Sequence, residues 1–199
     1  MIVGLTGPNA SGKGEVAVLL ASRGYVSHSL SDVVRERALA LGLDVGRATL
    51  IRVGQELRRE HGPAVLAETI LPRLGARAVV DSVRSPFEVA ALRRRPDFRL
   101  LGLDAPVEVR WRRAVARGRE GDQPSLDEFR RREALENTTN PEGQQLAAAL
   151  READAVVLND GTLEQLRERV LAVIAAWEAE PGGPRGAGAG DPAGHPEPR

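Results

Sequence analysis

Short, continuously apolar runs alternate along most of this chain with longer amphipathic stretches. The runs are too short for buried helices, and they lack the polar alternation of half-buried strands. They therefore predict strands that are buried on both faces. The predicted strands cover residues 2–6, 25–30, 78–81, 98–104 and 153–158.

The stretches between these runs repeat apolar residues at the spacing of helices that cover a sheet. Ser31 is the predicted N-cap of one of these helices, and Pro86 is the predicted start of another. Apart from the helix that begins at Pro86, the predicted helices cover residues 12–22, 32–41 (the helix that Ser31 caps), 47–60, 63–74, 106–117, 125–136, 144–151 and 162–179. Strands that alternate with helices in this way predict an α/β domain with a parallel sheet covered on both faces. We expect one domain over residues 1–180 and a disordered Gly- and Pro-rich tail over 181–199.

Composition narrows the range of functions. The chain has 199 residues, with 28 basic and 28 acidic side chains, and therefore no net charge that would attract nucleic acid. It has no cysteine, which excludes disulfides, thiolate zinc sites and a cysteine nucleophile. The beginning of the chain does not resemble a signal peptide, and no apolar stretch has transmembrane length. We expect a cytoplasmic protein with no nucleic-acid or membrane partner.

Residues 7–13 read GPNASGK and lie between the first predicted strand and the first predicted helix. This is the G-x-x-x-x-G-K phosphate loop in its required context. Its glycines let backbone N–H groups close around phosphates, and the helix N-terminus adds a positive dipole end. Lys13, the only lysine of the chain, is predicted to reach the β- and γ-phosphates. The predicted ATP-binding residues are Gly7, Asn9, Ala10, Ser11, Gly12, Lys13, Gly14 and Glu15.

Gly14 stands where most phosphate loops carry a Ser or Thr hydroxyl on Mg²⁺. Mg²⁺ readily keeps several of its waters, so the missing hydroxyl does not exclude a magnesium-dependent kinase. Asp81 ends a predicted strand at the carboxyl edge of the sheet, where ligand sites of α/β proteins lie. We predict that Asp81 holds Mg²⁺ through water. Ser82 follows in place of a water-activating Glu, which favours phosphoryl transfer over hydrolysis.

Arginines flank a polar, Gly-containing loop over residues 118–124. Phosphoryl transfer requires positive charge around the transferred group and exclusion of water, and a short Arg-bearing lid provides both. Arg113, Arg117 and Arg119 are the predicted lid residues. Because the chain is rich in arginine, each of them is also explained as an exposed charge on a helix surface.

Four segments resemble those of small-molecule kinases. The Gly12-Lys13-Gly14 sequence is similar to the phosphate loop of adenylate kinases, G-x-P-G-S-G-K-G-T. SDVVR at 31–35 and DSVRSP at 81–86 resemble the G-D-x-L-R and D-G-x-P-R segments of nucleoside monophosphate kinases. ADAVVLNDGT at 153–162 resembles a segment of dephospho-CoA kinases. From its start to about residue 177, the chain thus resembles this group of P-loop kinases, especially the branch labelled dephospho-CoA kinase-like or AAA-family ATPase.

The resemblance implies a three-layer P-loop NTPase fold, with a five-stranded parallel sheet in the order 2-3-1-4-5. It also implies a helical acceptor-binding insertion and a short lid. Arg35 and Arg84 would hold the acceptor phosphate, while Asn159 and Gly161 would lie beside the adenine of ATP. Arg58, on the insertion, is a candidate acceptor contact or a solvated charge on the helix surface.

The resemblance does not name the acceptor. A (deoxy)nucleoside monophosphate brings its own phosphate nucleophile, and the two arginine clamps favour it. In dephospho-CoA a ribose hydroxyl attacks, and Asp32 would then accept its proton. A third alternative is a non-catalytic ATP-binding regulator, which Gly14 favours and Asp81 opposes. The expected cofactors are ATP and Mg²⁺, the expected partner is a small nucleotide-like acceptor, and the expected assembly is a monomer or homodimer.

Overall fold

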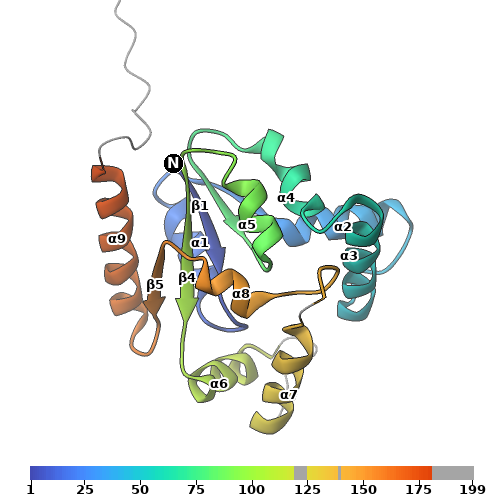
Figure 1. Ribbon diagram of the computed structural model, residues 1–199. Coiled ribbons are helices and arrows are strands. Elements are labelled where there is room, and N and C mark those ends of the chain that lie inside the picture. The colour runs from blue at the N-terminus through green and yellow to red at the C-terminus, as the bar shows by residue number, and fades with distance from the viewer. Residues whose placement is uncertain (119–124, 139, 181–199) are drawn as a thin grey trace, which may run out of the picture.

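In the computed structural model, which describes residues 1–118, 125–138 and 140–180, five parallel strands form one sheet (Figure 1). Its order is β2-β3-β1-β4-β5, and each neighbouring pair is parallel. The predicted fold class and strand order are therefore confirmed. The strands are β1 (Ile2–Thr6), β2 (Val26–Ser29), β3 (Ala78–Asp81), β4 (Phe98–Asp104) and β5 (Ala155–Leu158). The predicted tail over 181–199 lies outside the described residues.

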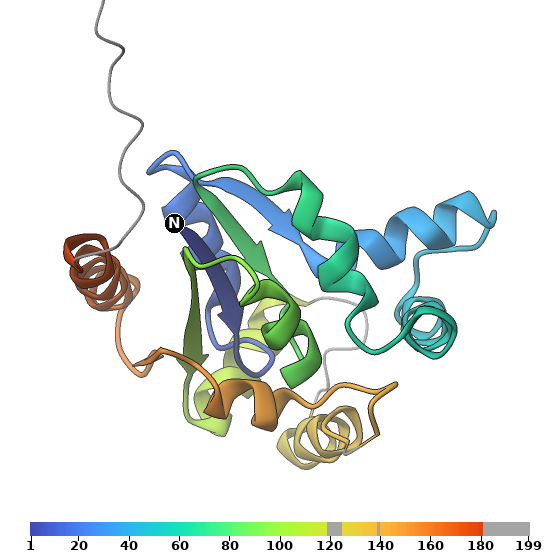
Figure 2. The ribbon, with the colours of Figure 1, turned by 45° about the horizontal axis from the view of Figure 1, so that its top comes forward.

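Helices connect the strands and cover both faces of the sheet (Figure 2). Alternate residues of β1 point to opposite faces, so Ile2 belongs to one apolar core and Val3 to the other. On one side α1 and α9 complete the core, and on the other side α2 to α5 and α8 do so. The helices are α1 (Lys13–Ala21), α2 (Leu30–Ala40), α3 (Arg47–His61), α4 (Val65–Ile70), α5 (Pro86–Leu92), α6 (Val107–Arg117), α7 (Leu126–Glu136), α8 (Leu146–Arg151) and α9 (Leu163–Ala179).

Helices α2, α3 and α4 form an insertion between β2 and β3, which we call the helical arm (Figure 2). Helix α3 packs on α2 and α4, and α4 packs on α5, which covers the sheet. Val53 and Leu57 bury one side of α3 in the same core as the α5 residue Val89. The helical arm is therefore attached to the sheet through a continuous apolar contact.

Two predicted helix boundaries are wrong, each for a local reason. Ser29, not Ser31, is the N-cap of α2, because β2 runs directly into the helix and its last residue keeps an extended backbone. The helix predicted over 63–74 ends at Ile70 and continues as a 3₁₀ turn, Leu71–Arg73. Pro72 explains that end, because proline has no N–H to donate and its ring disfavours a continued α-helix.

Within the described ranges, no helix is long and apolar enough to cross a membrane.

Substitution of Leu20 by alanine should destabilise the fold far more than the same change at Leu39. Leu20 is fully buried where α1 covers the sheet, whereas Leu39 is 64% exposed on α2. We expect Leu20→Ala to lower the free energy of unfolding by about 2–5 kcal/mol through cavity formation. Leu39→Ala should stay within about 0.5 kcal/mol of the wild type. Urea unfolding followed by circular dichroism measures both, and equal losses would contradict the assigned core.

Candidate active site

The phosphate loop joins β1 to α1 and requires glycine at both ends. Gly7 and Gly12 have φ angles of +135° and +109°, which other residues rarely adopt. A side chain would also collide at both positions. A Cβ on Gly7 would overlap the Leu103 carbonyl oxygen, and one on Gly12 would overlap the Asn159 amide nitrogen. The loop is thus held closely against the ends of β4 and β5.

Lys13 lies at the centre of the positive charge in the site. Its Nζ donates hydrogen bonds to the carbonyl oxygens of Gly7 and Pro8, at 2.7 and 2.8 Å. The pKa of Lys13 is lowered to about 8, chiefly by burial and then by the charge of Arg84, while Asp81 opposes the shift. An ammonium held among other cations is stabilised by a bound polyanion, so the site suits a polyphosphate.

Asp81 lies at the carboxyl end of β3, in register with Ser29 at the end of β2. Its Oδ1 accepts a hydrogen bond from Ser82 N at 2.6 Å, and Ser29 Oγ donates to Ser82 Oγ at 3.3 Å. These oxygens can accept hydrogen bonds from the waters of a magnesium ion, so the group fits the predicted metal role of Asp81. In residues 1–118, 125–138 and 140–180, no three His, Cys, Asp or Glu side chains gather into a metal-binding cluster.

The turn after β5 is tied to the phosphate loop through Asn159, which is 5% exposed. Asn159 Nδ2 donates to the Ser11 carbonyl at 2.9 Å. Arg113 donates to the backbone and side-chain oxygens of Asn159, at 3.0 and 3.2 Å, and to Gly161 O at 3.4 Å. The side chain of Arg113, a predicted lid residue, therefore lies on the turn that was expected beside the adenine.

Helix α6 also contacts the phosphate loop. Arg117 Nη2 donates to Asn9 Oδ1 at 3.4 Å. The buried Arg110 donates to Asn9 O at 3.4 Å and pairs with Glu133 of α7. The sequence pattern did not single out Arg110 or Glu133, because nothing in it places residue 133 beside residue 110. Arg119, the third predicted lid residue, lies outside the described residues.

On the other side of the phosphate loop, Asp32 and Arg35 form an ion pair at the start of α2. Arg35 Nη1 lies 2.7 Å from Asp32 Oδ1, and the side chains are 49% and 56% exposed for Arg35 and Asp32 respectively. Arg35 also donates to Ser31 Oγ at 3.2 Å. The two residues are three positions apart and therefore neighbours on the helix surface. Both of them line the large cleft that is described below.

The solvated position considered for Arg58 is wrong. Arg58 is 8% exposed, and its Nη2 lies 3.1 Å from Oε1 of Glu88, which is fully buried. Glu88 follows Ser85 by three residues, a spacing that from sequence indicates a helix cap. Ser85 does cap α5, but the Glu88 carboxylate extends to Arg58 and to the backbone N–H of Arg84. Arg84 itself donates to Gln144 Oε1 at 2.8 Å.

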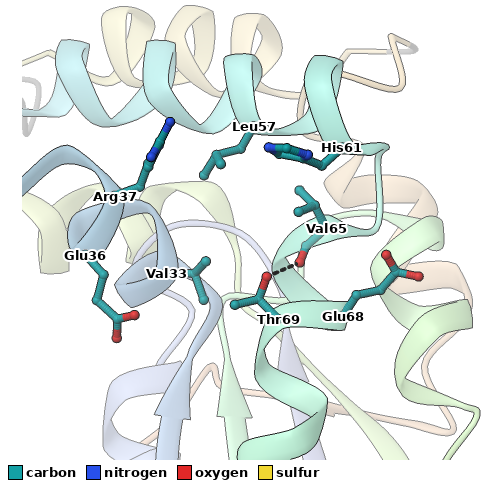
Figure 3. Close-up of a pocket in the computed structure, with 8 residues that line it drawn as sticks. All are labelled: Val33, Glu36, Arg37, Leu57, His61, Val65, Glu68 and Thr69. Atoms are coloured by element: carbon teal, nitrogen blue, oxygen red, sulfur yellow. Dashed lines mark hydrogen bonds between the residues drawn. The ribbon is translucent and has the colours of Figure 1, made fainter. Parts of the chain in front are cut away.

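One cleft of about 2270 Å³ brings these groups together. It is lined by the phosphate loop, by Asp32 and Arg58 of the helical arm, by Arg84 and by Asn159. Every predicted site residue that the structure describes lines the cleft except Ser11, which is buried. A second pocket of about 640 Å³ lies between α2, α3 and α4 and shares no residue with the cleft (Figure 3). In this pocket, Thr69 Oγ1 donates a hydrogen bond to the carbonyl oxygen of Val65.

A parallel sheet of this order, with a phosphate loop at its carboxyl edge and a helical arm across the cleft, defines a P-loop kinase-like domain. Residues 3–136 match the family described as AAA domain. Two curated relatives bear the name UPF0200 protein. The relative from Methanoculleus marisnigri is 33% identical over 178 residues (87% of this chain, 94% of the relative). The relative from Methanothrix thermoacetophila is 36% identical over 177 residues (87% and 96%). The chain therefore belongs to the AAA domain family and to the UPF0200 proteins.

Solved structures share the fold. TT1252 from Thermus thermophilus has 28% identity and a TM-score of 0.54, over 88% of this chain and 97% of that one. The shikimate kinase of Bacteroides thetaiotaomicron has 16% identity and a TM-score of 0.55, over 88% and 98%. The shikimate kinase of Aquifex aeolicus has 19% identity and a TM-score of 0.51, over 88% and 97%. Identities this low for the two kinases support the kinase-like fold alone.

The lowered pKa of Lys13 should make ATP binding weaken as the pH rises. ATP binds the ammonium form, and the pKa of Lys13 in the free protein is about 8. Below this pH the ammonium is already present, and the affinity should be nearly constant. Above it, binding must add a proton, and the dissociation constant should rise by up to about tenfold per pH unit.

Isothermal titration calorimetry in buffers of different ionisation enthalpy tests this dependence. At the pKa, binding should take up about half a proton. Lys13→Arg is the matched control, because arginine stays charged throughout the range and should bind without this pH dependence. A wild-type affinity that is independent of pH would show that Lys13 does not titrate there.

Proposed function

We propose that this protein catalyses ATP-dependent phosphoryl transfer to a small nucleotide-like acceptor, a (deoxy)nucleoside monophosphate in the form we favour. The observation that carries the proposal is a single cleft lined both by Lys13 of the phosphate loop and by the arginines Arg58 and Arg84. We assign Lys13 to the donor half of this cleft, and the buried Arg58 together with Arg84 to its acceptor half. A kinase requires this arrangement, because donor and acceptor must meet in one water-poor site.

On the donor side, ATP supplies the transferable γ-phosphoryl group. Lys13 exchanges the carbonyl oxygens of Gly7 and Pro8 for phosphate oxygens. Arg117, already in contact with the phosphate loop, adds positive charge at the same place. Arg113 and the turn at Asn159 form the side of the cleft that we assign to the adenine of ATP. Asp81 is assigned to the waters of Mg²⁺.

On the acceptor side, Arg58 and Arg84 offer guanidinium groups to an acceptor anion, and Arg35 lies farther out on α2. The phosphate of a nucleoside monophosphate is itself the nucleophile, so no general base is needed. Guanidinium groups suit such a phosphate because their planar fork matches two of its oxygens.

A hydroxyl acceptor such as dephospho-CoA is the second candidate, and Asp32 supports it. Asp32 lines the same cleft as the phosphate loop, and Arg35 Nη1 donates a hydrogen bond to its Oδ1 at 2.7 Å. Its other oxygen can accept the proton that an attacking hydroxyl loses. Asp32 therefore separates the two acceptor classes, since only the hydroxyl needs a base.

ADP release should identify the acceptor from a panel of nucleoside and deoxynucleoside monophosphates plus dephospho-CoA. We expect turnover with a monophosphate, and Lys13→Ala should lower kcat by roughly 100-fold or more because the charge that stabilises the transition state is lost. Asp32→Asn should change turnover of a monophosphate by less than about threefold but that of a hydroxyl acceptor by roughly 100-fold. ATP binding without turnover on any acceptor would contradict the kinase proposal and favour the regulator.

Replacement of Gly14 by serine should strengthen binding of Mg²⁺ together with ATP. Gly14 is exposed, and apart from its chain neighbours and its own helix backbone, no atom of the described residues lies within 4 Å of the position that a Cβ would take, so the side chain fits. Its hydroxyl would supply the metal contact that the loop lacks, and we expect the Mg·ATP dissociation constant to fall by roughly tenfold. Affinity for ATP in the presence of a chelator should not change.

Gly14→Ala is the matched control, because it adds the same Cβ without the hydroxyl. If the serine and alanine variants bind Mg·ATP equally, the proposed metal position beside residue 14 is wrong.

A further inference from the structure

Glu88 is a fully buried carboxylate that the proposed roles leave unused. It lies in the first turn of α5, the helix that follows β3 (Figure 1). Its Oε1 lies 3.1 Å from Nη2 of Arg58 on α3, and its Oε2 accepts the backbone N–H of Arg84 at 2.7 Å. The two oxygens of one carboxylate thus hold two separate segments of the acceptor half.

Both of these segments carry a guanidinium group that lines the cleft. The Nη1 of Arg84 bonds Gln144, and the Nε of Arg58 is buried with no hydrogen-bond partner among the described residues. The three charges of Arg58, Arg84 and Glu88 add up to one positive charge. The floor of the acceptor half therefore favours an anion, and the position of its cations depends on Glu88.

A gain in folding stability does not by itself explain the buried ion pair of Arg58 and Glu88. A buried ion pair gains little over apolar side chains of similar volume, because both charges lose their hydration. The Arg58–Glu88 pair joins the helical arm to the helix that covers the sheet, where apolar contacts already hold α3 and α4. What an apolar pair could not do is fix a guanidinium group at one point of the cleft.

We propose that Glu88 is the positioning residue of the acceptor site. It orients the Arg58 guanidinium and the Arg84 peptide so that one phosphate group of the acceptor meets both arginines. The proposal rests on the proposed function, and it adds that the acceptor's anionic group binds at the junction of α3 and α5. Glu88 itself does not touch the acceptor.

The decisive variant is Glu88→Gln, which keeps the volume and removes one acceptor oxygen. Two N–H donors, from Arg58 and Arg84, then compete for one carbonyl oxygen, and the amide NH₂ opposes the other donor. We expect the KM for the acceptor to rise at least about tenfold, since a displacement of about 1 Å at a binding group is enough for such a loss. The Kd for ATP should stay within about twofold, because Glu88 does not contact the phosphate loop.

Glu68→Gln is the matched control. Glu68 on α4 pairs with Arg94 just beyond α5 at 3.4 Å, and both side chains are exposed. It joins the same two parts of the molecule at the surface, so its loss should leave the acceptor KM unchanged. In addition, Arg58→Met and the double variant Arg58→Met/Glu88→Gln should have equal acceptor KM values, because without Arg58 only the Arg84 N–H remains, and the glutamine carbonyl oxygen can still accept it.

Inorganic phosphate, titrated against the ADP-saturated protein, gives a readout that does not need turnover. We expect the wild type and Glu68→Gln to bind phosphate alike and Glu88→Gln to bind it at least about threefold more weakly. Phosphate binding that depends on Glu88, without turnover on any acceptor, would refute the kinase proposal and retain the positioning role.

Turnover with an unchanged acceptor KM in Glu88→Gln would overturn the positioning role and leave the kinase proposal standing. An equal loss of ATP affinity and acceptor affinity in that variant would also overturn it, because it would show a general effect on folding. A wild type that neither turns over an acceptor nor binds phosphate would overturn both.

Discussion

The close approach of the phosphate loop to the ends of β4 and β5 is the constraint on which the rest of the site depends. Gly7 lies against the Leu103 carbonyl and Gly12 against the Asn159 amide, with no room for a side chain at either position. Because the loop is pressed against these strand ends, Asn159 can bond Ser11, and Arg113 can bond Asn159. The turn that we assign to the adenine of ATP and the phosphate loop are thereby fixed relative to one another.

The same edge of the sheet concentrates positive charge. Burial and the neighbouring arginines lower the pKa of Lys13, so a bound anion would stabilise its charged form. Arg110 and Arg117 reach the loop from α6, and Arg84 reaches the cleft from the β3–α5 connection. Preorganised charge of this kind is what phosphoryl transfer uses, because little covalent chemistry is left for the protein to perform. The negative charge of Asp81 opposes this lowering of the Lys13 pKa. Its position suits a magnesium ion that keeps its waters.

The half of the cleft that we assign to the acceptor is organised differently, through the junction of the helical arm with α5. There a buried carboxylate, Glu88, holds the Arg58 side chain and the Arg84 backbone, while Asp32 and Arg35 form an exposed pair farther out. The proposed acceptor site therefore has buried charged residues at its floor and an exposed ion pair at its rim. A small anion would find its fixed partners at the floor, and the rest of the acceptor would extend toward the rim.

The sequence by itself determined the sheet, its parallel direction and the phosphate loop, because these follow from patterns only a few residues long. Buried parallel strands are continuous apolar runs, and the G-x-x-x-x-G-K loop is a local backbone geometry. The strand order came from the resemblance carried by short motifs.

The tertiary structure decided which charges are buried and which side chains meet. Arg58 and Glu88 are 30 residues apart, and Asn159 and Ser11 are 148 apart. A local pattern marks Arg58 as a helix-surface charge and Glu88 as part of a cap. Only the packing of α3 on the helices around α5 brings them together, because contacts between distant residues depend on how elements pack and not on the sequence of either one.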